Sequence, residues 1–148
     1  RESRSVQPGA VPVVVDTPAG RLGLAVCYDL RFPELFRQLG AAQPLDLIVL
    51  PAAFTDTTGK AHWELLLRAR AVENQLFIAA CGQCGNHPGG RQTWGHSMVV
   101  DPWGEVLADA GSQPSCIRSS ADWRRIEQIR QAMPLAQHNK FSCHWQEE

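Results

Sequence analysis

Three strand-length apolar runs alternate with two helical patterns between residues 21 and 81, and this alternation limits the fold more than any other feature. The runs are RLGLAVC (21–27), LDLIVLP (45–51) and LFIAAC (76–81). Apolar side chains recur at helical spacing in PELFRQLGAA (33–42) and AHWELLLRARAVENQ (61–75). Strands that alternate with helices form sheets covered by helices, and runs without polar residues indicate strands buried on both faces. We therefore expect an α/β layered domain.

Hairpin-like segments flank this alternating region and make the predicted sheet a mixed one. The β-branched run VPVVV meets the Pro- and Gly-containing turn DTPAG before the first apolar run, and the turn DPWG separates two further strand patterns. CGNHPGGRQ is interpreted as a loop, and the last fourteen residues are interpreted as irregular. The additional predicted elements are strands over 11–15, 95–100 and 105–110, and a helix over 121–133 that ends at Pro134.

Charge and cysteine usage exclude several classes of partner. The 148 residues carry a formal net charge of −1, without a basic stripe or an acidic tail, so neither nucleic acid nor an anionic membrane is an expected partner. The longest apolar runs are too short to span a bilayer. Five cysteines, an odd number without regular spacing, are untypical of a secreted disulfide framework. We therefore expect a cytoplasmic protein.

Cys27 stands where the first apolar run stops, shortly before Pro33 opens the next helix. A cysteine in such a place is most often a small buried hydrophobe. The order strand, cysteine, turn, helix nevertheless resembles a nucleophile elbow, and α/β sheets place their sites at the carboxyl ends of strands. In such an elbow the backbone amide of Tyr28 would donate to an oxyanion. Cys27 is therefore a candidate nucleophile.

A thiol needs a neighbouring base or cation, because a free cysteine with a pKa of about 8.5 is mostly protonated at neutral pH. None of the histidines has a spacing that marks it as this base, so we expect them to be exposed or structural. Glu2 is an alternative carboxylate, which the strand pair 11–15 and 21–27 could bring near Cys27. The histidines in question are His62, His87, His96, His138 and His144.

Cys81 and Cys84 have the CxxC spacing of a redox dithiol or of half a zinc site. A zinc site needs a second pair of ligands, and Cys116 and Cys143 are solitary. A redox dithiol is expected at the start of a helix, whereas here a glycine-rich stretch follows. We therefore expect neither function, and no metal site.

Four blocks of sequence resemble the nitrilase (carbon–nitrogen hydrolase) superfamily and occur in that family's order. The resemblance covers residues 1–138 and leaves 139–148 as an irregular tail outside it. Within the superfamily, CYDLRFPE, RARAVENQ, AACGQCGNH and MPLAQH are most similar to the deaminated glutathione amidase branch. The four blocks are VCYDLRFPEL, VLPAAF, AHWELLLRARAVENQLFIAACGQCG and WGHSMVVDPWGEVLADAG.

This resemblance implies a four-layer α-β-β-α sandwich that forms homodimers through its outer helices and uses no metal or organic cofactor. It also implies a mechanism in which a cysteine attacks an amide carbonyl, ammonia leaves, and water hydrolyses the thioester. Cys27 matches the nucleophile, Tyr28 the backbone oxyanion donor, and Glu2 a supporting glutamate.

The resemblance also places the family's general-base glutamate and its lysine upstream of Arg1. Neither Lys60 nor Lys140 stands in the matching context, and we expect Glu64 and Glu73 to make structural contacts. The chain is therefore expected to be the C-terminal half of an amidase that cleaves the terminal amide of a small ω-amide such as deaminated glutathione. The alternatives are an inactive fragment or pseudoenzyme that acts as an interaction module, and an omega-amidase acting on 2-oxo acid amides.

Overall fold

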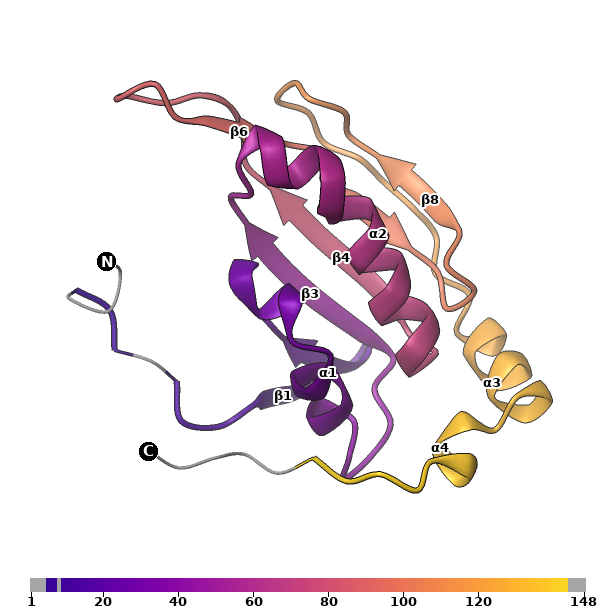
Figure 1. The fold of residues 1–148 in the computed structure, drawn as a ribbon. Helices are drawn as coiled ribbons and strands as arrows, with labels where there is room; N and C mark the ends of the chain where they lie inside the picture. The colour runs from indigo at the N-terminus through magenta and orange to yellow at the C-terminus, as the bar shows by residue number, and fades with distance from the viewer. Residues whose placement is uncertain (1–4, 8, 144–148) are drawn as a thin grey trace.

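The computed structural model describes residues 5–7 and 9–143. A six-stranded sheet with the order β1-β2-β3-β4-β7-β8 forms its centre, and a two-stranded hairpin, β5-β6, extends from one end (Figure 1). The strands are β1 (Val13–Thr17), β2 (Gly20–Leu24), β3 (Leu47–Ala52), β4 (Phe77–Gly82), β5 (Cys84–Asn86), β6 (Gln92–Trp94), β7 (Met98–Val100) and β8 (Val106–Asp109). The helices are α1 (Pro33–Leu39), α2 (Asp56–Asn74), α3 (Trp123–Ala132) and α4 (Leu135–His138), with a 3-10 helix, η2, at Cys27–Arg31.

The sheet is mixed, as the sequence predicts. Strands β2, β3 and β4 run parallel, with Leu22 opposite Leu47 and Leu47 opposite Phe77. The hairpins attach β1 to β2 and β8 to β7 in antiparallel fashion, and β7 pairs antiparallel with β4. Helices α1 and α2 cross over between the parallel strands, as parallel pairing requires.

One face of the sheet packs against α1 and α2 (Figure 1) and forms the main core. Ile48 and Ile78 are fully buried there, and Trp63 and Leu67 of α2 lie against the same cluster. Gly23 is needed on this face because a Cβ at that position would lie 2.7 Å from the Leu45 Cδ1 atom. The close approach explains a glycine in the middle of β2.

The other face of the sheet is largely uncovered in the described part of the chain, so the prediction of strands buried on both faces is wrong there. Leu24 remains 39 % exposed, and Val13 and Val15 of β1 remain 47 % and 41 % exposed. Phe77 is the buried exception, because the Trp123 ring of α3 packs edge-on against it at 5.3 Å. The described residues thus form one helix layer, α1 and α2, on one sheet, while α3 covers the second face only at Phe77 and the rest of that face is apolar and open.

Several element boundaries also differ from the sequence expectations. Strand β2 ends at Leu24, so Cys27 begins the following 3-10 helix instead of ending the strand. The segment 84–92, expected to be a loop, contributes to the β5-β6 hairpin, and the short helix α4 interrupts the tail that was expected to be irregular. Helix α2 begins at Asp56, because Thr55 caps it by accepting the Thr58 N–H at 3.4 Å.

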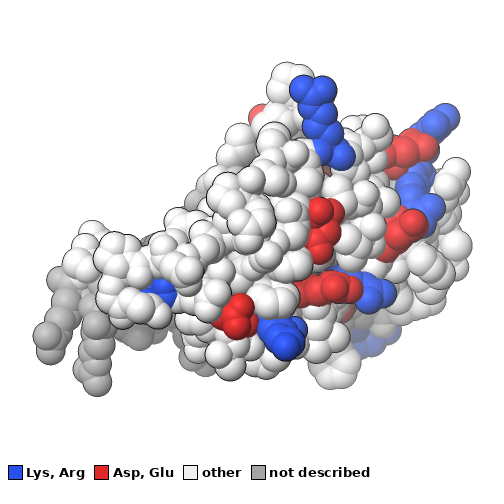
Figure 2. All heavy atoms as spheres, turned by 90° about the horizontal axis from the view of Figure 1, so that it is seen from above, with Lys and Arg blue, Asp and Glu red and all other residues white. Residues whose placement is uncertain are grey.

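Acidic and basic side chains are intermingled on the face seen from above (Figure 2), where they do not form a patch of one sign. Across residues 5–7 and 9–143, no helix has the length and apolar character needed to cross a membrane.

Candidate active site

The carboxyl ends of the three parallel strands meet at one edge of the sheet, where α/β proteins place their sites. The turn that contains Cys27 follows β2, and Phe54 and Thr55 follow β3. Gln83 follows β4 and is tied to the same edge, because its N–H donates to the Ala52 carbonyl at 2.9 Å. The fold therefore brings the candidate nucleophile to the edge that the sequence predicts.

Cys27 has a backbone φ of +46°, in the left-handed region that residues with a Cβ rarely adopt. It is half-buried and its side chain packs against the main core. Strained backbone of this kind persists only where the surrounding structure imposes it, and it is concentrated at functional sites. This conformation distinguishes Cys27 from an ordinary core cysteine.

Cys27 and Tyr28 form the start of the 3-10 helix, whose first backbone bond runs from the Asp29 N–H to the Val26 carbonyl at 3.0 Å. N–H groups ahead of the first bond have no partner within their own helix. The Tyr28 N–H is one of these groups, and it directly follows the candidate nucleophile in the chain. The side chain of Tyr28 is 65 % exposed.

Arg31, at the end of the same turn, places a cation at this edge. Its guanidinium carbon lies 5.0 Å from the centre of the Phe54 ring and 5.5 Å from that of the Tyr28 ring. Its Nη1 atom lies 3.3 Å from Nδ1 of His62 on α2. Contacts with two aromatic rings hold the guanidinium near the turn formed by Cys27–Arg31.

The far side of the turn is held from α2 by a buried arginine. The Leu30 carbonyl accepts hydrogen bonds from the Nε and Nη2 atoms of Arg70 at 3.2 and 2.9 Å, and Leu30 is fully buried. Arg70 is 4 % exposed and pairs with the Glu73 carboxylate at 3.2 Å. Glu64 pairs similarly with Arg68 at 3.4 Å. Both glutamates therefore make structural contacts, as expected.

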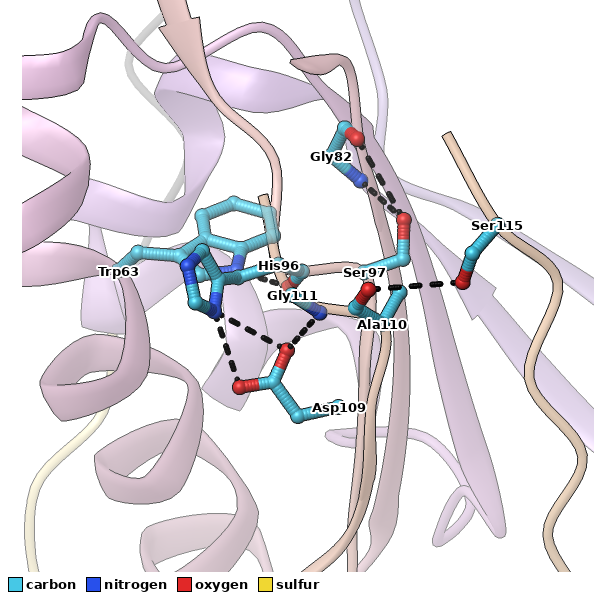
Figure 3. Close-up of polar contacts among 8 residues, drawn as sticks. All are labelled: Trp63, Gly82, His96, Ser97, Asp109, Ala110, Gly111 and Ser115. Atoms are coloured by element: carbon cyan, nitrogen blue, oxygen red, sulfur yellow. Dashed lines mark hydrogen bonds and ion pairs between the residues drawn. The ribbon is translucent and has the colours of Figure 1, made fainter. Parts of the chain in front are cut away.

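His96 anchors the strand β7 side of the edge (Figure 3). Its Nδ1 atom lies 3.0 and 3.1 Å from the two carboxylate oxygens of Asp109, and its carbonyl accepts the Trp63 Nε1–H at 2.7 Å. The Asp109 carboxylate also accepts the Gly111 N–H at 2.8 Å. With a φ of +54° and a ring stacked on Trp94 at 4.5 Å, His96 fixes a turn, which agrees with the expected structural role.

The remaining candidates lie apart from this arrangement. His87 bonds Thr93 at 2.7 Å within the β5-β6 hairpin, and His138 ends α4. Cys81 and Cys84 are free thiols on β4 and β5, away from any helix start. Among the residues described, no group of three or more His, Cys, Asp or Glu side chains could hold a metal ion.

Glu2 and His144 lie outside the described residues. Three residues of the edge were not singled out from the sequence: Asp29, Arg31 and Arg70. Asp29 had a detectable signal, since an acidic residue at the third helical position often bonds back to the residue before the helix. Arg70 gave no signal of its own in the sequence. It falls on the apolar face of the helix at the same spacing as its apolar neighbours, and that spacing does not show which carbonyl the side chain would bond.

The carbon–nitrogen hydrolase family model matches residues 1–131 of the chain. A deaminated glutathione amidase from Yersinia enterocolitica is 51 % identical over 141 residues, which cover 95 % of this chain and 49 % of that protein. The crystal structure of Saccharomyces cerevisiae Nit3, a member of branch 10 of the nitrilase superfamily, superposes with a TM-score of 0.86 at 38 % identity, covering 95 % of this chain and 51 % of that one.

A mutant amidase from Nesterenkonia sp. AN1 is also similar, with a TM-score of 0.73 and 33 % identity over 93 % of this chain and 52 % of that one. Its structure shows the acetamide moiety of fluoroacetamide covalently added at the active-site cysteine. The chain spans about half the length of the curated relatives it matches. The nitrilase-type α/β fold that the sequence predicts is thus confirmed, with one sheet and its helices present here.

Proposed function

The chain belongs to the carbon–nitrogen hydrolase family, and from that premise we propose that it carries the nucleophile of an amidase. The proposed substrate is a small ω-amide such as deaminated glutathione, whose terminal amide is cleaved with release of ammonia. The similarity to deaminated glutathione amidases supports this substrate class. The observation that carries the proposal is the left-handed Cys27 at the carboxyl edge of the parallel strands.

Each step of the proposed reaction conserves atoms and charge. The Cys27 sulfur, as thiolate, attacks the amide carbonyl carbon and forms a tetrahedral oxyanion, which the Tyr28 N–H stabilises. The oxyanion collapses, the C–N bond breaks, and the nitrogen leaves as ammonia after accepting a proton. Water then attacks the resulting thioester, releasing the carboxylic acid and regenerating the thiol.

A general base must take the thiol proton and pass a proton to the leaving nitrogen. The family resemblance assigns this role to a glutamate and further oxyanion stabilisation to a lysine. Lys60 is exposed on α2 and Lys140 is exposed beyond α4, and Glu64 and Glu73 are paired with arginines. We therefore place the base and the lysine in polypeptide outside residues 1–148, with Glu2 as a supporting carboxylate.

The complete enzyme is proposed to be a cytoplasmic homodimer that needs no metal or organic cofactor. Its partner in the reaction is the small amide alone, without nucleic acid. The face seen in Figure 2 mixes acidic and basic side chains, whereas a face that binds nucleic acid collects basic ones.

The test is ammonia release from deaminated glutathione and from a simple ω-amide. The assay compares residues 1–148, a longer protein that includes the missing glutamate and lysine, and Cys27→Ala in both. Cys116→Ala is the matched control, because Cys116 is free and exposed. We expect the longer protein to turn over, Cys27→Ala to reduce it to background, and Cys116→Ala to leave it unchanged.

Acid-quenched samples of the longer protein should also contain an acyl adduct on the peptide that includes Cys27. Turnover that survives Cys27→Ala would overturn the proposal. Turnover by residues 1–148 alone, lost in Cys27→Ala, would keep the nucleophile but contradict the placement of the base and lysine outside this chain.

A further inference from the structure

Asp29 makes two hydrogen bonds to the backbone of Val26, and these bonds span Cys27 and Tyr28, which lie between the two residues in the chain. Its Oδ2 atom accepts the Val26 N–H at 2.8 Å, and its own N–H donates to the Val26 carbonyl at 3.0 Å. The proposed nucleophile and the proposed oxyanion donor are the two residues enclosed. We propose that Asp29 is a positioning residue of this active site, which holds Cys27 in its left-handed conformation; the inference rests on the proposed function.

The turn needs such a hold because its conformation is unfavourable. A φ of +46° brings the Cβ of a non-glycine residue close to the following carbonyl oxygen. Val26 stands at the N-cap position of the 3-10 helix, but its side chain has no polar atom with which to cap the helix. Asp29 supplies the missing polar contact from the opposite direction, by reaching back to the Val26 backbone.

The residues on either side of the turn are hydrogen-bonded to other elements of the fold. On the sheet side, the Ala25 N–H donates to the Val49 carbonyl at 3.2 Å, and on the helix side Arg70 holds the carbonyl of the buried Leu30. Between these anchors Val26 is 60 % exposed and Tyr28 is 65 % exposed. Burial therefore constrains Val26 and Tyr28 weakly, although the Cys27 side chain lies against the core, and the two Asp29 bonds span all three residues.

The length and charge of the side chain both suit this role. An aspartate at the third helical position reaches the N–H of the N-cap residue, and a charged acceptor gives a stronger bond than a neutral one. Asparagine keeps an acceptor oxygen at the same distance from the backbone, whereas alanine removes it. The pair Asp29→Asn and Asp29→Ala thus separates the hydrogen bond from the charge.

The first test measures the chemistry of Cys27 independently of amide hydrolysis. Residues 1–148 are treated with iodoacetamide at pH 7, and the alkylation rate of Cys27 is followed by peptide mass spectrometry relative to Cys116 in the same molecules. The matched control is Asp122→Ala, since Asp122 also accepts a helix-start N–H, that of Arg124, at 3.1 Å.

We expect Asp29→Ala to slow Cys27 alkylation about tenfold, because a residue with a Cβ that is no longer held leaves the left-handed conformation, and its thiol then loses the position that the turn gives it. Asp29→Asn should restore a rate close to that of the unchanged chain, and Asp122→Ala should not alter it. Equal rates in Asp29→Ala and the unchanged chain would overturn the proposal. So would an Asp29→Asn variant as slow as Asp29→Ala, because charge and not the hydrogen bond would then be responsible.

The second test uses the longer protein that hydrolyses the amide. Asp29→Ala should lower kcat about 10²-fold, the usual cost of misplacing a reacting group, with little change in KM. A structural defect at a distance would lower the amount of active enzyme, and titration of active sites through the acyl adduct corrects for that. A kcat per titrated site equal to that of the unchanged enzyme would contradict the role.

A third measurement needs no variant and remains decisive if Asp29→Ala does not fold. The Val26 amide should be protected from hydrogen exchange despite the exposure of this residue, because Asp29 accepts its proton. Exchange at the rate of an unstructured peptide would overturn the inference. Failure of the proposed function is distinguishable, since hydrolysis would then survive Cys27→Ala whatever the Asp29 variants do.

Discussion

Arg70→Met is the substitution whose effect on stability follows most directly from the structure. Arg70 is 4 % exposed and donates two hydrogen bonds, at 3.2 and 2.9 Å, to the carbonyl of the fully buried Leu30. Methionine keeps an apolar stem but removes the guanidinium, which lies 5.5 Å from the centre of the Phe36 ring and donates to this carbonyl. A buried polar group left unpaired costs about 1–3 kcal/mol. Glu73 is 38 % exposed on its side chain, so water replaces its arginine partner and adds little.

We therefore expect Arg70→Met to lower the free energy of unfolding by about 2 kcal/mol, measured by urea titration with circular dichroism. Arg124→Met is the matched control, because Arg124 pairs with Asp122 at 2.9 Å but is 83 % exposed on its side chain. Its unfolding midpoint should shift far less than that of Arg70→Met, because an exposed ion pair contributes little. A free energy of unfolding for Arg70→Met equal to that of the unchanged chain would refute the view that Arg70 anchors the Cys27 turn through Leu30.

Three further predictions concern other parts of the chain. Hydrogen bonds from the Arg124 side chain and backbone hold the pKa of the Asp122 carboxyl below its usual 3.8. The stability that the Asp122 carboxylate contributes is therefore present above pH 3.8 and is lost as the pH falls through the lowered pKa. An NMR titration of this carboxyl should show a midpoint below 3.8, and Arg124→Ala should raise that midpoint. Gly59→Ala should destabilise the chain by about 1–3 kcal/mol in the same urea titration, although alanine favours helix, because a Cβ there would overlap the Trp94 side chain; a gain in stability would contradict this. Cys81 is exposed on the open sheet face and should react with iodoacetamide as readily as Cys116 in residues 1–148, but more slowly in a longer protein that covers this face.

The sequence predicted the elements whose signals are local. Apolar runs and helical spacing predicted β2, β3 and β4 with α1 and α2 between them, because each run is long enough for its period to be visible. The position of Cys27 at the sheet edge then followed from the parallel topology. The three-residue strands β5 and β6 were missed, since so few residues among glycines show no alternation.

The conformation of Cys27 could not be predicted in the same way. A glycine or an asparagine in a sequence indicates a possible left-handed backbone, but a cysteine does not. The turn that contains it is bonded by Asp29 and, through the Leu30 carbonyl, by Arg70 from forty residues further along the chain. Contacts of that separation leave no periodic signal, so the geometry of the site had to come from the structure.

The open sheet face and the proposed location of the base and lysine outside residues 1–148 have a common explanation. The run 21–27 was interpreted as buried on both faces because it is apolar, yet Leu24 is 39 % exposed. A further layer would remove this apolar face from water, and a cysteine nucleophile needs a neighbouring base. We expect one additional layer to cover this face and to supply the base, since the turn that contains Cys27 directly follows the strand that ends at Leu24. Slower reaction of Cys81 in the longer protein and turnover dependent on Cys27 should therefore appear together, and one without the other would separate the two requirements.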